Sequence, residues 1–246
     1  MKRFENKTIL ITGASSGIGL AGAKRLIEEG AHVIFTGRTE SHVQAAAAEL
    51  GDHATAVLDD VSDGNTLERI VPVVERAGAL DGVWLNAAYA AGGPLEEMDQ
   101  ATLEQIFKVN VVAPMIQMGA LSPYVKDGGS VLVTSSTAAY EGAPIVSAYA
   151  ATKAAILAAA RGWASELAPR NIRVNSLVPG PITSNLRSVL PDEMRAQFEE
   201  RLAEAVLLKR VGDAHEAAAV ALFLLSDEAS YVTGSSYTVD GGLIMQ

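Results

Sequence analysis

The chain of 246 residues contains no cysteine. This absence excludes disulfides, thiolate metal sites and a cysteine nucleophile. Long apolar runs are also missing, because no stretch approaches the ~18 uninterrupted apolar residues that a membrane span needs. The first residues lack the long apolar region and small-residue cleavage site of a signal peptide. We therefore expect a cytoplasmic protein with no membrane partner.

Positive charge is scarce as well. The chain has 19 Lys and Arg against 29 Asp and Glu, a formal net charge of -10. Such a balance disfavours binding to nucleic acid or anionic lipid, so we predict no nucleic-acid partner. Hydrophobic residues make up 49% of the chain and charged residues 20%, which is ordinary globular composition. We find no linker, low-complexity tract or internal repeat, and predict a single domain over residues 1–246.

Short β-branched runs alternate with longer Ala-rich segments along the chain. Continuous apolar strands separated by helices indicate a parallel sheet covered on both faces. With right-handed crossovers, this pattern predicts a doubly wound α/β fold. The predicted strands are 8–12, 32–36, 55–58, 82–85, 130–134, 173–177 and 236–239. The predicted helices are 17–29, 40–50, 63–77, 101–126, 149–168, 191–206 and 213–226.

A glycine loop follows the first predicted strand and leads into a helix. Gly13, Gly17 and Gly19 lie at this turn. Glycines allow the backbone to approach a pyrophosphate and the helix to pack closely on the strand. The free N–H groups and the dipole at the helix start favour a phosphate. The spacing differs from the general G-x-G-x-x-G fingerprint, so a turn that only packs is the alternative.

The same loop also satisfies the G-x-S-x-G pattern of hydrolases, with Ser15 at its centre. That interpretation needs a histidine downstream, and His215 is the candidate at the start of a predicted helix. In hydrolases of this type the motif follows several earlier strands, whereas here it follows the first. We keep the hydrolase as a minor alternative.

The end of the second predicted strand bears on the choice of cofactor. An acidic residue there would bind the ribose hydroxyls of NAD. This chain has Gly37 and Arg38 instead. A guanidinium suits a 2′-phosphate through paired charge-assisted hydrogen bonds, with hydroxyl donors available at Ser15 and Thr39. The sequence favours NADP(H), with NAD(H) as the alternative if Glu40 contacts the ribose and Arg38 is only solvated or stacked.

Tyr149 and Lys153 lie four residues apart in an Ala-rich segment that Pro169 is expected to end. Residues at i and i+4 share one helix face. A nearby cation favours the phenolate, so Lys153 is expected to lower the pKa of Tyr149 from about 10. Such a tyrosine can exchange a proton with a carbonyl or an alcohol. The alternative is an unrelated pair on a solvated helix.

Together these motifs resemble those of the short-chain dehydrogenase/reductase family, nearly from end to end. The family's T-G-x-x-x-G-I-G appears as residues 12–19, and its Asp-Val pair as Asp60-Val61. Its N-N-A-G segment appears as residues 85–88, with Leu85 and Ala88 replacing the first Asn and the last Gly. Further matches are Asn110, Ser136, Asn175 and the segment 179–183.

The resemblance implies a single-domain Rossmann fold and an NAD(P)-dependent oxidoreductase acting on a carbonyl or alcohol. It implies that Tyr149 is the general acid/base, that Lys153 binds the nicotinamide ribose, that Ser136 binds the substrate oxygen and that Asn110 holds a water in a proton relay. The residues expected to bind the cofactor are Gly13, Ser15, Ser16, Gly17, Ile18, Gly19, Gly37, Arg38, Thr39, Asp60, Val61, Asn86, Ala87, Ala88, Tyr149, Lys153, Pro179, Gly180, Ile182 and Thr183.

The resemblance also places a substrate lid at about residues 184–210. Its apolar side chains line a pocket or merely pack the lid; they are Leu186, Val189, Leu190, Met194 and Phe198. The helices predicted at 101–126 and 149–168 are similar to those through which the family pairs, which implies a homotetramer or a dimer. No metal is expected, because the four histidines lack ligand-like spacing. A cofactor-binding sensor or scaffold is the alternative function, supported by the altered segment 85–88.

Overall fold

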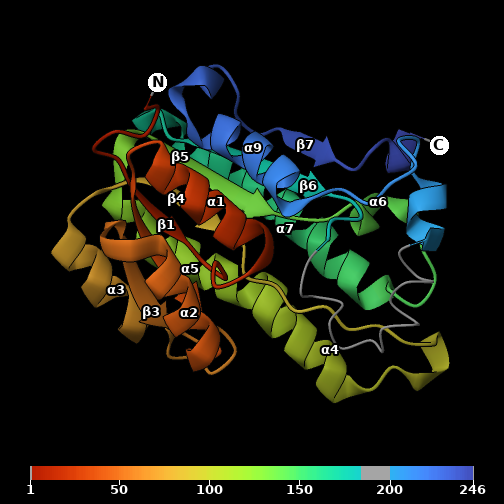
Figure 1. Cartoon of the computed structure of the whole chain (residues 1–246). Coiled ribbons are helices and arrows are strands. Elements are labelled where there is room, and N and C mark those ends of the chain that lie inside the picture. Colours follow the sequence, from red (N-terminus) through yellow and green to blue (C-terminus); the bar gives the residue numbers. More distant parts are fainter. Residues whose placement is uncertain (1, 184–199, 246) are drawn as a thin grey trace.

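The computed structural model describes residues 2–183 and 200–245. Its centre is a seven-stranded sheet in which every paired strand is parallel, in the order β3-β2-β1-β4-β5-β6-β7 (Figure 1). The strands are β1 (Thr8–Ile11), β2 (His32–Gly37), β3 (Ala54–Leu58), β4 (Leu80–Leu85), β5 (Val125–Thr134), β6 (Arg173–Pro179) and β7 (Ser236–Val239). The predicted Rossmann-like α/β fold with seven parallel strands is confirmed.

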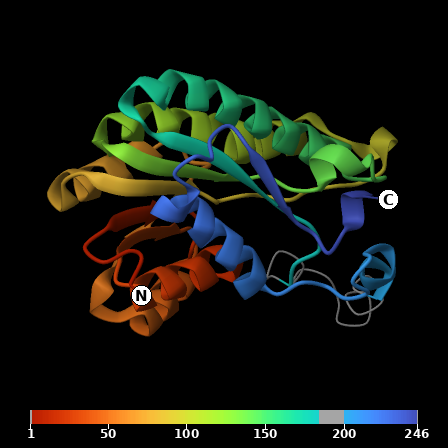
Figure 2. The same cartoon turned by 90° about the horizontal axis from the view of Figure 1, so that it is seen from above.

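Helices cover both faces of this sheet, as Figure 2 shows. One face carries α1 (Gly17–Glu28), α2 (Glu40–Leu50) and α9 (Ala214–Leu225). The other carries α3 (Thr66–Ala77), α5 (Ala113–Leu121) and α7 (Ser147–Leu167), with α4 (Gln100–Phe107) beside α7. A short helix, α6 (Ala138–Glu141), joins β5 to α7.

Alternate side chains of each central strand enter two separate cores. Ile9 and Ile11 of β1 pack with the α1 and α9 layer, whereas Leu10 between them packs with the α3 and α7 layer. All three are fully buried. Each such side chain stabilises the fold by roughly 1.5–3 kcal/mol relative to an exposed one. The sheet is therefore packed against helices on both faces, and this packing fixes the positions of the loops at its edge.

The helix predicted at 101–126 is wrong as a single element. The segment divides into α4, a π-helical turn at Lys108–Val112, α5 and a 3₁₀ turn at Ser122–Tyr124, and β5 then begins at Val125. Pro114 lies in the first turn of α5 and has no N–H for the carbonyl four residues earlier. The N–H of Ala113 instead donates to the carbonyl of Lys108, the longer π-type bond.

Other boundaries differ by a few residues. Helix α7 begins at Ser147, so Tyr149 lies in its first turn, and it ends at Leu167 before Pro169 as expected. Helix α3 begins at Thr66 instead of 63, and β4 and β5 begin earlier than predicted. Of the helix predicted at 191–206, residues 200–205 are helical. Residues 191–199 of that helix lie outside the described residues. So do residues 184–199 of the lid expected at about 184–210, with its five apolar candidates.

Candidate functional site

The parallel strands all end at one edge of the sheet, where the loops that carry the sequence motifs begin. Ile11 of β1 is paired with Trp84 of β4, and Leu85 is paired with Val133 of β5. The residues that follow these strands are therefore neighbours. This register brings the glycine loop, Asn86 and the serines after β5 to one place, as expected for a doubly wound fold.

The glycine loop is held tightly against the end of β4. Gly13 has a φ of +67°, and a Cβ added to it would lie 2.7 Å from Cα of Ala87. Thr12 Oγ1 accepts hydrogen bonds from the N–H groups of Asn86 (3.0 Å) and Ala87 (3.1 Å). Asn86 Nδ2 donates in return to the Gly13 carbonyl (3.1 Å). Only glycine fits at position 13, because of both its conformation and this close backbone approach.

Helix α1 starts immediately behind this loop with free donors. Its N-cap residue Ser16 makes no side-chain capping bond. The N–H groups of Gly17, Ile18 and Gly19 have no acceptor within residues 2–183 and 200–245. Unpaired N–H groups and the helix dipole together attract an anionic group. The loop therefore fits the pyrophosphate of a dinucleotide.

The end of β2 lies beside the glycine loop and is open to solvent. A Cβ at Gly37 would lie 2.6 Å from Ser15 Oγ, so the two turns touch. Arg38 and Thr39 are exposed, and Arg38 makes no hydrogen bond or ion pair with any residue that the structure describes. The N–H of Asp59 donates to the Gly37 carbonyl (2.8 Å) and places Asp60-Val61 next to this edge.

Ser136, Tyr149 and Lys153 come together on the other side of the edge. The Ser136 hydroxyl lies near enough to the Tyr149 phenol to influence its pKa. The Lys153 Nζ lies 5.6 Å from the centroid of the Tyr149 ring and donates to the Thr134 carbonyl at 3.0 Å. Lys153 is 2% exposed. The predicted i, i+4 pair therefore lies beside the predicted serine, with Lys153 buried and Tyr149 and Ser136 half-buried.

The expected effect of Lys153 on Tyr149 is wrong for this structure. Burial raises the pKa of Tyr149 to about 12, and the nearby Ser136 hydroxyl opposes this rise. Burial also lowers the pKa of Lys153 to about 8. The ammonium lies over the ring and bonds to a carbonyl, so removal from water outweighs its attraction for a phenolate. Tyr149 is thus held as the neutral phenol at neutral pH.

Two further polar residues support this cluster. Ser135 donates to the Lys153 carbonyl (2.8 Å), so its hydroxyl is used by the fold, in keeping with the choice of Ser136 as the site serine. Asn110, in the π-helical turn, donates to the Tyr89 carbonyl (2.8 Å) and to Thr152 Oγ1 (3.1 Å). It also accepts from the Tyr89 N–H (2.8 Å). Asn110 braces the loop after β4 against α7, and its predicted water relay stays a prediction.

The segment after β6 completes the edge. The Pro179 carbonyl accepts from the Thr137 N–H (3.0 Å), one residue beyond Ser136. Gly180 donates to the Val239 carbonyl (3.0 Å), and Thr183 donates to the Gly212 carbonyl (2.9 Å). The backbone predicted to line the nicotinamide is thereby fixed next to Ser136 and Tyr149.

Sequence reasoning missed two residues here, Trp84 and Thr134. The Trp84 indole donates to Thr134 Oγ1 (2.8 Å), which in turn donates to Asn86 Oδ1 (3.0 Å). A tryptophan in an interior strand was the available signal, because a buried indole N–H needs an acceptor. The replacement of Asn by Leu85 also has a simple outcome, since Leu85 packs in the core between the sheet and α3, α5 and α7.

The hydrolase alternative finds no support in the geometry. Within the described residues, no hydrogen bond joins Ser15 to a histidine, and no cluster of three or more His, Cys, Asp or Glu side chains could hold a metal ion. In the same part of the chain, no helix is long and apolar enough to cross a bilayer.

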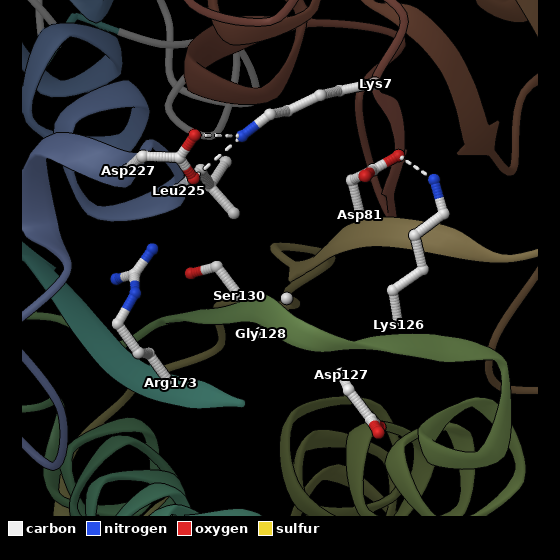
Figure 3. A pocket seen from close by; sticks show the side chains of 10 residues that line it. Lys7, Asp81, Lys126, Asp127, Gly128, Ser130, Arg173, Leu225 and Asp227 are labelled. Atoms are coloured by element: carbon white, nitrogen blue, oxygen red, sulfur yellow. Dashed lines mark hydrogen bonds and ion pairs between the residues drawn. The ribbon is translucent and has the colours of Figure 1, made fainter. Parts of the chain in front are cut away.

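A small cavity of about 70 Å³ lies at the opposite, amino edge of the sheet (Figure 3). Its charged side chains satisfy one another. Lys7 pairs with Asp227 (2.7 Å), Lys126 pairs with Asp81 (2.9 Å), and Arg173 donates to the carbonyls of Leu224 and Ser226. This cluster ties the end of α9 to the sheet and leaves the carboxyl edge as the candidate site.

Known proteins match this chain over nearly its whole length. Residues 13–244 match a family model described as enoyl-(acyl carrier protein) reductase. An oxidoreductase, asL5, from Sarocladium schorii is 37% identical over 99% of this chain and 98% of its own length. The dehydrogenase/reductase SDR family member 4 of Sus scrofa is 36% identical over 98% of this chain and 88% of its own. The solved structure of BdcA in complex with NADPH is 34% identical, with a TM-score of 0.87 over 97% of this chain and 95% of that one.

Burial of Lys153 leads to a prediction about stability. Its folded-state pKa of about 8 lies below the ordinary 10.5. Below pH 8 the buried charge opposes folding; between pH 8 and 10.5 the unfolded state binds more protons, so stability rises with pH. Lys153→Met should therefore raise the free energy of unfolding at pH 7 by about 2 kcal/mol, after the loss of one hydrogen bond. Urea denaturation from pH 7 to 10.5 measures this gain, which should shrink as pH rises.

Exposed Lys2→Met is the matched control and should change stability little at any pH in this range. A Lys153→Met variant that is destabilised equally at pH 7 and pH 10.5 would contradict burial as the cause of the lowered pKa.

Proposed function

Because the chain belongs to the short-chain dehydrogenase/reductase family, and so is an NAD(P)-dependent oxidoreductase, we propose that it interconverts a carbonyl and a secondary alcohol with Tyr149 as the general acid/base. A single observation carries the proposal: Tyr149 lies beside Ser136, with Lys153 over its ring, at the sheet edge that also presents the glycine loop. Neither a proton donor alone nor a dinucleotide-binding loop alone would support this function.

The groups of the site suit reduction of a carbonyl. A nicotinamide cofactor held at the glycine loop would supply the hydride. Tyr149, with its pKa near 12, is protonated at neutral pH and donates its phenolic proton to the carbonyl oxygen. Ser136 positions that oxygen and stabilises the negative charge that develops on it. Lys153, whose ammonium donates to the Thr134 carbonyl, would bind the ribose hydroxyls and return a proton to the phenolate.

Tyr149→Phe removes the transferable proton and keeps the ring. We expect kcat to fall by about 10²–10⁴-fold, the range typical of general acid/base groups. Affinity for NADPH should stay within a few-fold, because the glycine loop is untouched. A steady-state assay over a panel of carbonyl substrates with NADPH and NADH measures turnover, and titration of protein fluorescence measures binding.

Tyr231→Phe makes the same chemical change at a fully exposed position and serves as the control. A sensor or scaffold would bind cofactor without turnover on the whole panel, and Tyr149→Phe would then change nothing. These two results together would favour a sensor or scaffold over an enzyme.

The proposed preference for NADP(H) depends on Arg38. This guanidinium is exposed at the end of β2 with no partner within the described part of the chain, beside Ser15 and Thr39. A 2′-phosphate would meet a free planar donor there and no carboxylate at position 37 or 38.

Arg38→Ala should lower the ratio of NADPH to NADH efficiency by roughly 10–100-fold, since hydrogen bonds to charged groups contribute about 1.5–3 kcal/mol. We expect kcat/KM to fall with NADPH and to stay unchanged with NADH. Measurement of kcat/KM with both cofactors tests this, with exposed Arg76→Ala as the control. An unchanged ratio would favour NAD(H) as the cofactor, with Glu40 in contact with its ribose.

We also propose that the chain forms a homo-oligomer, a tetramer or a dimer, through the outer surface of α4 and α5. Large apolar side chains are at least one-third exposed along this surface: Leu103, Phe107, Val112, Met115 and Ile116. Leu103, Phe107, Val112 and Ile116 recur every four or five residues, a spacing close to that of one helix face, and a second copy could cover such a face. The family resemblance supports the segment 101–126, together with the helix at 149–168, as the pairing surface.

Ile116→Glu places a charge within this surface, so we expect a smaller species than the wild type in size-exclusion chromatography with light scattering. Tyr231→Glu, at an exposed site elsewhere, should leave the mass unchanged. A wild-type protein with the 25.7 kDa mass of a single chain at micromolar concentration would refute the interface.

A further inference from the structure

Trp84 lies fully buried near the end of β4, directly below helix α1. A Cβ added to Gly22 of α1 would lie 2.3 Å from Cζ3 of the indole, so the ring fills the space that this glycine leaves. The helix that begins at the phosphate-binding loop therefore lies on the face of this indole. Its one polar atom, Nε1, donates to Thr134 Oγ1.

The hydrogen bonds beyond the indole run in one direction. Indole N–H can only donate, so Thr134 Oγ1 must accept and its own proton is left for Asn86 Oδ1. This fixes the amide of Asn86, whose Nδ2 then donates to the Gly13 carbonyl. Trp84, Thr134, Asn86 and Gly13 thus form a single chain of donors and acceptors from the helix layer to the glycine loop. Such chains polarise each member in turn.

Thr134 also reaches the proton-transfer side of the site. It is the last residue of β5, two residues before Ser136. Its carbonyl accepts from the Lys153 ammonium at 3.0 Å. Thr134 therefore contacts two parts of the site. Its hydroxyl contacts the Asn86 amide, which orients the glycine loop, and its backbone carbonyl contacts the buried Lys153.

We propose that Thr134 is a positioning residue, which joins the cofactor loop to Lys153 through the directed chain from Trp84 to Gly13. The inference rests on the proposed function, because it concerns the same site. Leu85, which lies at the end of β4 and packs into the opposite core, supplies no polar group here. The Thr134 hydroxyl is the group that ties the ends of β4 and β5 together at this point.

Removal of the hydroxyl has two separate consequences. The Trp84 indole N–H is left buried without an acceptor, which destabilises the fold. Asn86 loses the donor that fixes its amide, so its bond to the Gly13 carbonyl is no longer enforced and the cofactor loop is less well placed. A serine at this position keeps both bonds, because it has the same hydroxyl.

Thr134→Val tests the proposal, with titration of NADPH and NADP⁺ and measurement of kcat and KM as readouts. We expect the Kd for NADPH to rise at least about tenfold and KM for NADPH to rise with it. Thr134→Ser should stay within about threefold of the wild type. Ser130→Ala is the matched control, because it removes a buried hydroxyl bond (to the Leu224 carbonyl, 3.0 Å) four residues earlier in the same strand.

A second variant keeps the test decisive if Thr134→Val does not fold. Trp84→Phe/Thr134→Val removes the orphaned indole N–H as well, and removal of both partners costs less stability than removal of one. This double variant still leaves Asn86 without its donor. The affinity of the variant for NADPH should therefore remain at least about tenfold weaker than that of the wild type. Wild-type affinity in either valine variant, or an equal loss in Ser130→Ala, would overturn the proposal.

Failure of the proposed function gives a different result. A wild-type protein that binds neither NADPH nor NADH in the titration would refute the dinucleotide site itself. A wild-type protein that binds NADPH, with a valine variant that binds it equally well, refutes only the role of Thr134.

Discussion

The site depends on one constraint, the parallel register of the central strands. Because β1, β4 and β5 run in the same direction and are paired residue by residue, Thr12, Asn86 and Ser135 emerge at one edge. Hydrogen bonds between the loops then become possible, as between Thr12 Oγ1 and the Asn86 N–H. A slip of one residue would turn every side chain of a strand to the other face and remove these bonds. The two cores on either side make such a slip costly.

At that edge the protein buries polar groups at the expense of stability. Lys153 is 2% exposed, and burial moves its pKa down while it moves that of Tyr149 up. The two shifts favour the neutral amine and the neutral phenol, so neither charge is easily formed in the protein alone. The Thr134 carbonyl and the Ser136 hydroxyl offset part of this cost. A proton donor beside a lysine of lowered pKa suits transfer near neutral pH.

Prediction from the sequence succeeded where local pattern and residue type are sufficient. Continuous apolar strands between amphipathic helices predicted the sheet, and the i, i+4 spacing placed Tyr149 and Lys153 on one helix face. It failed over residues 101–126, where Pro114 imposes a π-helical turn that Ala and Leu content does not reveal. It also failed for the pKa of Tyr149, because burial is a property of the packed chain and helix spacing says nothing about it.

The sequence by itself determined the strand–helix alternation, the glycine loop, the position of Arg38 after the second strand and the spacing of Tyr149 and Lys153, since each depends on neighbouring residues. Only the tertiary structure decided which groups satisfy one another across the sheet. The Trp84 indole donates a hydrogen bond to Thr134, fifty residues away in the chain, and Asn86 donates one to the Gly13 carbonyl, seventy-three residues away. A buried donor requires an acceptor, but the sequence does not identify that acceptor until strand order and register bring two strand ends together.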